Sequence, residues 1–559
     1  MSIIDANAAC AEVFDVCVVG GGPAGLAVAL DCVEAGMRTL IVEAGGLTAS
    51  TEADPMFAAE IAPGSPHAPV ERVCRRGLGG ASSCWGRRCV PFDPSDFGSE
   101  DDGRWPVDWR EMETWRARTA RFLDCGDVFD LAPPAGWEAE GAVRASQHER
   151  WSPPAALARR VERLRDEGGP CVLLKAAAVG FEYEQAGGAA PFAVRAIRVR
   201  LEGRPATVRA NWFVLACGGL ETTRLLLSEQ RARPALFGGP EGPLGRFYMG
   251  HLTGAVARLA FSSRDDARAF EVRRGETGDH VRRFLTLSPE LRAASGIGNI
   301  GFWVDNPPAE DSTHGSAFLS LKHFAMTHPA IPRRLKPRSW PSKAGAPQDW
   351  RRFGANILAD PLGGLVDLAE AARRRLVEDG HAPARLVRTR NGAYALRYHA
   401  EQRPSRESRV RLAEEADHEG ASRLRIEYKV EAADARSVFE AHEALDAALR
   451  RSGKGRLSYI RPKREAVDHV AEQALDGFHQ IGTTRMSEDP RLGVVDRTCR
   501  THGFSNLFIA SSSVFPTSGR ANPTFMVVSL SLRLAAHLAR LDSGLERRSP
   551  ASSAGRLAS

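Results

Sequence analysis

The clearest hydrophobic pattern of the chain lies near its N-terminus. Residues 14–20 (FDVCVVG) form a run of apolar and β-branched side chains, which predicts a buried strand. After a glycine-containing turn, residues 26–36 (LAVALDCVEAG) have the pattern of a helix, and residues 39–45 (TLIVEAG) predict a second strand. Strand, helix and strand in this order predict a β-α-β unit of a parallel sheet.

Further apolar runs predict that this sheet is completed from distant parts of the chain. Residues 172–184 and 193–203 read as strands of a meander, and residues 212–216 (WFVLA) as a buried strand that returns to the first sheet. The segment 107–123 is predicted to be helical, and NLFIA at 506–510 is predicted to be a strand.

The middle of the chain has a different pattern. Residues 252–462 mix alternating strands, arginine-rich helices and Pro-rich loops such as 328–341, without a glycine fingerprint, which indicates a separate substrate domain. The expected organisation is 1–105, first part of a nucleotide-binding domain; 106–165, a helical segment of the substrate domain; 166–251, second part of the nucleotide-binding domain; 252–462, substrate domain; 463–542, C-terminal part of the nucleotide-binding domain; 543–559, a disordered tail.

Composition and charge narrow the function classes. The chain has 559 residues, 43% hydrophobic and 26% charged, with a net charge of +6. Its scattered arginines do not form a nucleic-acid footprint, so no nucleic-acid partner is expected. No apolar run approaches the length of about 18 residues that would span a membrane, and no signal peptide is evident. Ten separated cysteines without zinc-ligand spacing indicate reduced thiols, no metal and a cytoplasmic location.

The first turn carries a dinucleotide fingerprint. Gly20 allows the tight turn, Gly22 allows close approach of a pyrophosphate, and Gly25 allows the helix to pack on the strand. Glu43 ends the second strand, where a carboxylate would bind the ribose hydroxyls of adenosine and repel the 2′-phosphate of NADP.

A second glycine-rich stretch, residues 76–92 (RGLGGASSCWGRRCVPF), has two interpretations. Gly77, Gly79 and Gly80 could form an ordinary surface loop, or they could bring backbone close to a planar ligand or diphosphate, with Ser82 and Ser83 as hydrogen-bond partners. The sequence alone scarcely separates the two.

The C-terminal quarter carries the candidate catalytic residues. His479 lies in HQIGTTRM, and Asn522 precedes Pro523 and Thr524 at the start of an apolar helix. His479 could be a structural histidine or a general base, since its usual pKa suits proton transfer at neutral pH. Asn522 is a preferred N-cap and Pro523 suits the first helical position, so a capping role is expected, with or without a role in the site.

These motifs together resemble the glucose-methanol-choline (GMC) family of FAD-dependent oxidoreductases over about residues 14–540. The resemblance rests on VVGGGPAGL, GLGGASSCWG, VLACGGLETTRLLL and HQIGTTRM followed by ANPT. It implies an α/β fold (α+β overall), in which a Rossmann-like FAD domain is built from discontinuous segments and a substrate domain has an antiparallel sheet with flanking helices.

The resemblance also assigns residues. His479 would be the general base and Asn522 would orient the substrate oxygen. Several relatives attach the flavin covalently through a histidine at the position held here by Cys84, so a histidyl linkage is excluded. Non-covalent FAD is expected, and a cysteinyl linkage at Cys84 is the alternative. The predicted cofactor-binding residues are Gly20, Gly22, Gly25, Glu43, Gly79, Gly80, Ser82, Ser83, Cys84, Trp85, Val179, Ser511, Ser512, Asn522, Pro523 and Thr524. Glu401 and Gln402 are candidates to face the substrate, His251 is expected to be structural, and Arg485 is expected to pair with a buried carboxylate or to lie near the site.

The leading hypothesis is FAD-dependent oxidation of a small-molecule alcohol, a sugar, aminosugar or polyol-like metabolite, as in bacterial sugar oxidoreductases and aminoglycoside-tailoring enzymes. Oxygen or another molecule would accept the electrons. A lyase of the same fold that keeps FAD without redox turnover is the alternative. A non-catalytic flavoprotein is a third hypothesis, and the presence of both His479 and Asn522 disfavours it. The oligomeric state is not predicted.

Overall fold

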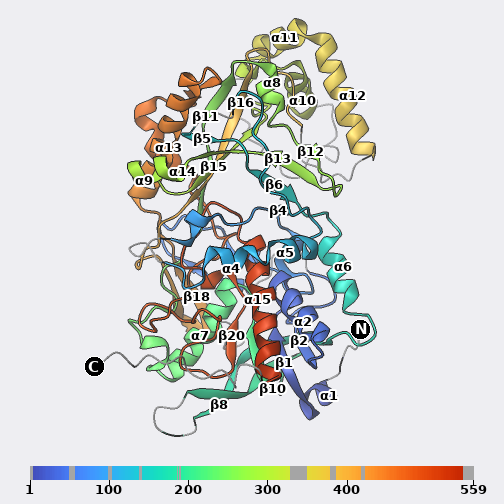
Figure 1. The fold of residues 1–559 in the computed structure, drawn as a ribbon, viewed down its shortest axis with the longest axis vertical. Helices are drawn as coiled ribbons and strands as arrows, with labels where there is room; N and C mark the ends of the chain where they lie inside the picture. Colours follow the sequence, from blue (N-terminus) through green and yellow to red (C-terminus); the bar gives the residue numbers. More distant parts are fainter. Residues whose placement is uncertain are drawn as a thin grey trace, which may run out of the picture.

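The computed structural model describes residues 4, 6–49, 57–98, 104–137, 141–185, 187, 191–327, 349–377, 385–416 and 422–544. Figure 1 shows a lower part around β1, β10 and α15 and an upper part around β11, β15 and β16. Each part has its own buried hydrophobic cluster. The predicted Pro-rich loop 328–341 and most of the predicted disordered tail, from residue 545 on, lie outside the described residues.

The lower part is built on a seven-stranded sheet. Its strand order is β7 (Cys171–Leu173), β2 (Thr39–Val42), β1 (Val13–Val19), β10 (Arg204–Leu215), β9 (Phe192–Leu201) and β8 (Ala176–Gln185), with β20 (Leu507–Ile509) also pairing with β10. The pairs β7–β2, β2–β1, β1–β10 and β10–β20 are parallel. The strands β8 and β9 and the first half of β10 form an antiparallel meander. The predicted β-α-β unit and the return of 212–216 to the first sheet are confirmed.

The long strand β10 joins these segments. Its first half pairs antiparallel with β9, whereas its last residues pair in parallel with β20, at Phe213↔Leu507. Along its other edge it pairs in parallel with β1, from Val13↔Arg209 to Val19↔Leu215. Segments about 300 residues apart in sequence therefore end at one edge of one sheet, where parallel sheets bind ligands.

Helices cover this sheet. α2 packs on β1 and β2, and it also packs against α15, the buried C-terminal helix. The helices of the lower part are α1 (Ala6–Ala11), α2 (Pro23–Glu34), α3 (Val70–Val73), α4 (Trp109–Glu113), α5 (Arg116–Phe122), α6 (Ala156–Arg163), α7 (Gly219–Ala232) and α15 (Thr524–Asp542).

The upper part is built on a six-stranded antiparallel sheet, as predicted for the substrate domain. Its strand order is β19 (Gly455–Tyr459), β11 (His251–Phe261), β16 (Ala393–Glu401), β15 (Ile300–Asp305), β14 (Leu285–Leu287) and β5 (Val143–Arg144). Its helices are α8 (Arg264–Arg268), α9 (Pro289–Ser295), α10 (Ala317–Thr327), α11 (Trp350–Ala359), α12 (Pro361–Val377), α13 (Ala432–Arg451) and α14 (Ala466–Gln473).

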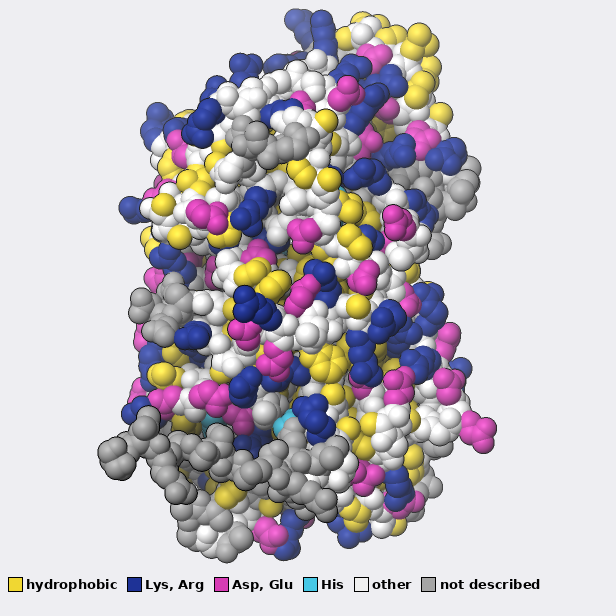
Figure 2. All heavy atoms as spheres, viewed as in Figure 1, with side chains coloured by type: hydrophobic (Ala, Val, Ile, Leu, Met, Phe, Trp, Pro, Cys, Tyr) yellow, Lys and Arg dark blue, Asp and Glu magenta, His cyan; other side chains and the backbone are white. Residues whose placement is uncertain are grey.

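Two smaller sheets complete the fold. One consists of β12 (Arg273–Arg274), β13 (His280–Arg283), β6 (His148–Trp151) and β4 (Arg88–Cys89), and the other of β17 (Arg409–Ala416), β18 (Ser422–Glu427) and β3 (Glu60–Ile61). The second of these sheets joins residues from the expected segment 252–462 to the expected segment 1–105. On the face in Figure 2, basic and acidic side chains are interspersed.

The segment 107–123 is helical, as predicted. It forms two helices, α4 and α5, because the amides of Thr114 and Trp115 bond to carbonyls three residues back and tighten the turn. The predicted cap of the C-terminal helix is wrong. In α15, Pro523 holds the N-cap position, and the Asn522 side chain makes no capping hydrogen bond among the described residues.

Helix α15 is also long and apolar enough, by length and composition, to cross a membrane. The sequence prediction of no membrane span is therefore not confirmed. However, 61% of its apolar window is buried inside the protein, where it packs against α2 and α5. A core helix of this kind is apolar because apolar groups surround it, as they surround a helix in a membrane.

Candidate active site

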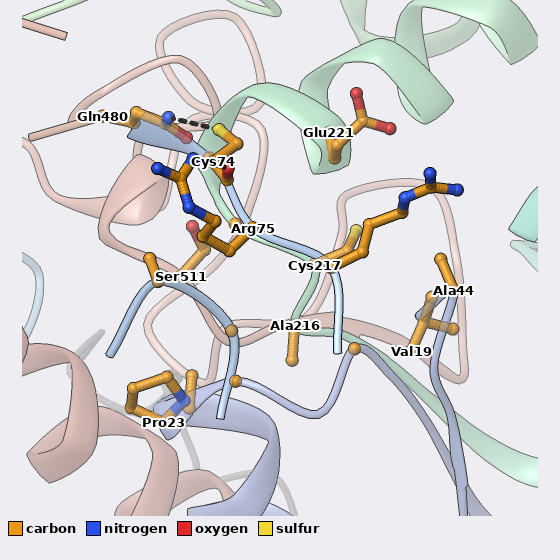
Figure 3. Close-up of a pocket in the computed structure, with 18 of the residues that line it drawn as sticks. Val19, Pro23, Ala44, Cys74, Arg75, Ala216, Cys217, Glu221, Gln480 and Ser511 are labelled. Carbon is orange, nitrogen blue, oxygen red and sulfur yellow. Dashed lines mark hydrogen bonds between the residues drawn. The ribbon is translucent and has the colours of Figure 1, made fainter. Parts of the chain in front are cut away.

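A large cavity opens at the carboxyl edge of the parallel strands. It holds about 1310 Å³ of space, open solvent included. Its walls come from the first glycine turn, the end of β2, the second glycine loop, β8, the end of β10 with the start of α7, the loop after α14, and the start of α15. Figure 3 shows part of this wall, with Pro23 and Ala216 on one side and Cys74 and Gln480 on the other.

The three fingerprint glycines occupy the positions that the sequence predicts. Gly20 has a φ of 104°, and a Cβ there would lie 2.6 Å from the Ala216 carbonyl oxygen. At Gly25 a Cβ would lie 1.9 Å from the Gly20 carbonyl oxygen, so helix and strand pack in direct contact. Gly22 lines the cavity, and a Cβ there would meet nothing within 4 Å. This backbone cradle fits a diphosphate.

Two helices begin at the cavity without a capping side chain. Pro23 is the first residue of α2, and Thr524 is the first residue of α15. The N-cap residues, Gly22 and Pro523, accept no hydrogen bond with a side chain. Because the first amides of a helix lack intrahelical partners and the helix dipole is positive there, both ends suit negative charge. The cavity residues therefore fit an anionic dinucleotide cofactor such as FAD.

Glu43 also lines the cavity and is buried. Its carboxylate accepts hydrogen bonds from the amides of Gly21 (2.8 Å), Gly45 (2.7 Å) and Gly77 (2.8 Å). It thereby ties the first glycine turn to the second glycine loop. The ribose contact predicted for Glu43 stays a prediction.

The second glycine loop packs on the first. The Gly79 amide donates to the Gly21 carbonyl at 2.8 Å, and a Cβ at Gly80 would lie 3.2 Å from the Gly22 Cα. Gly80 and Ala81 line the cavity. This arrangement favours the ligand-binding interpretation of the loop over that of an ordinary surface loop.

Other predicted cofactor residues differ in their placement. Ser511 and Ser512 line the cavity. Ser82 and Ser83 donate to the carbonyls of Gly79 and Gly80 within their own turn, and the Cys84 side chain is exposed. Gly79, Trp85 and Val179 are not among the lining residues, and on β8 the wall is formed by residues 176–178. The roles of these residues in binding FAD stay predictions.

His479 and Asn522 are brought together, as the sequence predicts. Nδ2 of Asn522 lies 3.3 Å from Nε2 of His479 and can donate to it. Phe478 and Gln480, on either side of the histidine, line the cavity, as does Pro523 beside the asparagine. The His479 side chain is 18% exposed, and neither His479 nor Asn522 is itself among the residues that line the cavity.

A tight turn positions His479. Asp476 Oδ1 accepts from the amides of Gly477, Phe478 and His479 at 2.7, 2.8 and 3.1 Å. Gly477 has a φ of 120°, and a Cβ there would lie 2.6 Å from the His67 ring, so only glycine fits.

Asp476 remains charged beside the histidine. Burial acts to raise its pKa, but electrostatic attraction to His479 and hydrogen bonds from His479 and His251 outweigh burial and lower it to about 2. Its Oδ2 lies 3.3 Å from His479 Nδ1. The site therefore holds a fixed negative charge next to the candidate base.

Two further histidines adjoin His479. The pairing of β11 with β16 stacks the His251 and His399 rings with centroids 4.2 Å apart, and His251 Nδ1 lies 2.9 Å from His479 Nδ1. Burial, with repulsion from neighbouring histidines, lowers the pKa of His251 to about 3 and that of His399 well below its usual value. Both rings are therefore neutral.

These three histidines could hold a metal by the spacing of their nitrogens. All of their ring nitrogens except His399 Nε2 already have hydrogen-bond partners among the described residues. The cluster is thus held together by hydrogen bonds, and the absence of a resident metal stays a prediction.

The candidate substrate residues have structural partners. Gln402 is buried; its Oε1 accepts from the Gly250 amide (2.8 Å) and the Tyr428 hydroxyl (2.7 Å), which fixes the start of β11. Glu401 accepts from the Asn299 amide at 2.8 Å. Arg485 lies over the Phe247 ring. Contact of Glu401 and Gln402 with a substrate stays a prediction.

Sequence reasoning missed Asp476, His399 and the contact of His251 with His479. It also missed Gln480 and Cys74, which bond to each other in the cavity wall (Figure 3). Asp476 stands three residues before His479, a spacing that could have indicated it. The histidines on β11 and β16 converge through long-range pairing, for which the local pattern carries no signal.

Comparisons with known proteins agree with this site. Residues 15–249 match the family model described as FAD dependent oxidoreductase, and residues 404–531 match the model described as GMC oxidoreductase. The large subunit of fructose dehydrogenase from Gluconobacter japonicus is 47% identical over 57 residues, which is 10% of each chain.

Among solved structures, pyridoxine 4-oxidase from Mesorbium loti has a TM-score of 0.52 at 17% identity, over 94% of this chain and 98% of that one. This likeness supports the fold. Both matching family models are oxidoreductase models, so the lyase alternative is not favoured. The cofactor is FAD, and the chain is an FAD-dependent oxidoreductase whose C-terminal region matches the GMC oxidoreductase model.

Proposed function

We propose that this protein oxidises a primary or secondary alcohol to the carbonyl compound, with His479 as the general base. The observation that supports this most directly is the position of His479 Nε2, 3.3 Å from Asn522 Nδ2 beside the uncapped start of α15. FAD, when bound, supplies the acceptor for a hydride.

The protein's own residues would do the following. Asn522 would orient the substrate oxygen, while His479 Nε2 takes the hydroxyl proton as hydride leaves the carbon. Asp476 would stabilise the positive charge that His479 then carries. The amides at the starts of α2 and α15, together with Gly22, would bind the anionic parts of the cofactor. The exposed position of Cys84, away from the cavity lining, supports non-covalent binding.

We propose a sugar, aminosugar or polyol-like metabolite as the substrate. The 57-residue match to a fructose dehydrogenase subunit supports this, since fructose is a polyhydroxylated small molecule. An aminoglycoside-type substrate is a narrower form of the same proposal. We also propose that the protein acts in the cytoplasm. Oxygen or another acceptor would reoxidise the cofactor.

The test is a substrate panel under nitrogen. Fructose, glucose, sorbitol, pyridoxine and neamine are each mixed with the purified holoenzyme, and the flavin absorbance near its visible maximum is followed. We expect at least one of these alcohols to bleach the flavin and to yield the carbonyl product. The proposal would be contradicted if an alcohol were consumed without bleaching of the flavin, or if the flavin stayed oxidised with every alcohol of the panel.

A further inference from the structure

The hydrogen bonds of His251 define which of its nitrogens carries the proton. Its Nε2 lies 3.2 Å from the Ser518 carbonyl oxygen. A carbonyl can only accept, so Nε2 must carry the hydrogen. His251 is buried and neutral, and its Nδ1 therefore presents a lone pair.

This lone pair in turn defines the tautomer of His479. The two Nδ1 atoms are 2.9 Å apart, so His479 Nδ1 donates to His251 Nδ1, with Asp476 Oδ2 at 3.3 Å as a second acceptor of the same hydrogen. In neutral His479 the remaining lone pair then lies on Nε2, the nitrogen beside Asn522. An imidazole with the hydrogen on Nε2 would place two lone pairs against each other at the His251 contact and could not accept the substrate proton.

Two neighbours hold the pair in this geometry. The His399 ring lies against His251 at 4.2 Å and 32°, and its own Nδ1 is bonded to the Arg520 carbonyl oxygen at 2.6 Å. Asp476 Oδ2 accepts from the His251 amide at 2.7 Å, and a Cβ at Gly250 would lie 2.6 Å from the same oxygen. The carboxylate is thereby fixed between the two histidines.

We propose that His251 is a positioning residue for alcohol oxidation, which holds His479 in the tautomer whose Nε2 is the base. The inference rests on the proposed function and names the side chain that prepares its base. In the step, the O–H proton passes to Nε2 and a hydride leaves the carbon for FAD, giving the carbonyl. Nδ1–H stays bonded to His251, and Asp476 faces the resulting imidazolium.

A pair of matched variants separates positioning from packing. His251→Asn keeps an acceptor near the Nδ1 position, whereas His251→Gln keeps a donor near the Nε2 position for Ser518 but has no acceptor for His479. In single-turnover flavin reduction by the panel alcohol that reacts fastest, we expect His251→Gln to be slowed by about 10²-fold, as for a misplaced catalytic group, and His251→Asn by about fivefold or less. FAD content should be equal in both. Equal rates for the two variants, or a faster Gln variant, would overturn the inference.

The tautomer itself can be measured in the unsubstituted holoenzyme, which needs neither a variant of His251 nor a known substrate. Nitrogen-15 histidine NMR, with the His479 signals assigned by their loss in His479→Ala, should show a protonated Nδ1 and a lone pair on Nε2. The opposite tautomer refutes the role of His251 even if alcohols reduce the flavin. Failure of every alcohol in the panel would count against the proposed function and leave this readout intact.

Discussion

At the scale of single residues, Asn522 contacts His479 and makes no capping hydrogen bond among the described residues. Asn522→Ala removes the amide that would orient the substrate oxygen, a hydrogen bond worth about 1 kcal/mol, so flavin reduction should slow by about five- to tenfold. Loss of an N-cap costs about 0.5–2 kcal/mol, and because Asn522 makes no capping bond the variant should lose less than about 0.5 kcal/mol of unfolding free energy.

Stopped-flow reduction and urea unfolding check the two halves of this prediction. Asn522→Asp is the matched control, since it keeps a capping oxygen but has no amide donor. A large stability loss in the Ala variant that Asp restores would show that Asn522 is a helix cap after all.

At the scale of elements, the turn between β1 and α2 predicts opposite outcomes for two similar substitutions. Gly22→Ala adds a methyl group into open cavity space, so the apoprotein should keep its stability while FAD binds more weakly. Gly25→Ala drives a methyl group into the Gly20 carbonyl, so the apoprotein should lose about 1–3 kcal/mol or more.

Thermal melts of the apoproteins and FAD titrations measure both quantities. If Gly22→Ala were as unstable as Gly25→Ala, or bound FAD normally, the assignment of the cavity to the cofactor's diphosphate would be wrong.

The elements also show what sequence could predict. The β1-α2-β2 unit follows from local periodicity and from glycines whose partners are nearby in the chain. The Asn522 cap was mispredicted because the side chain's partner, His479, lies 43 residues away. The histidine cluster depends on the β11–β16 pairing and on the bridge between Met249 and Ile481, neither of which leaves a local signal.

At the scale of the whole molecule, buried histidines make stability depend on pH. Burial lowers the pKa of His148, His314 and His442 to about 4 and that of His251 to about 3. The unfolded chain binds protons at these groups below about pH 6.5, whereas the folded protein does not. Stability is therefore full above about pH 6.5 and falls as the pH drops toward 4.

His442, on α13 between Phe302 and Tyr398, offers a test away from the site. A folded pKa of about 4 against about 6.5 when unfolded makes its contribution fall by about 2 kcal/mol between pH 7.5 and 5. His442→Gln should reduce the pH dependence of the unfolding free energy by that amount. Urea unfolding at both pH values measures this change. If the pH dependence of the unfolding free energy were the same in the variant, His442 would be protonated in the folded protein at pH 5, and its pKa would not be lowered.

The central claim is that His479 accepts the substrate proton. The most direct measurement is the rate of anaerobic flavin reduction in His479→Ala against the unsubstituted protein, at saturating alcohol and with FAD content checked. General-base catalysis predicts a loss of about 10²–10⁴-fold with FAD retained. A near-normal rate in the alanine variant would contradict the account.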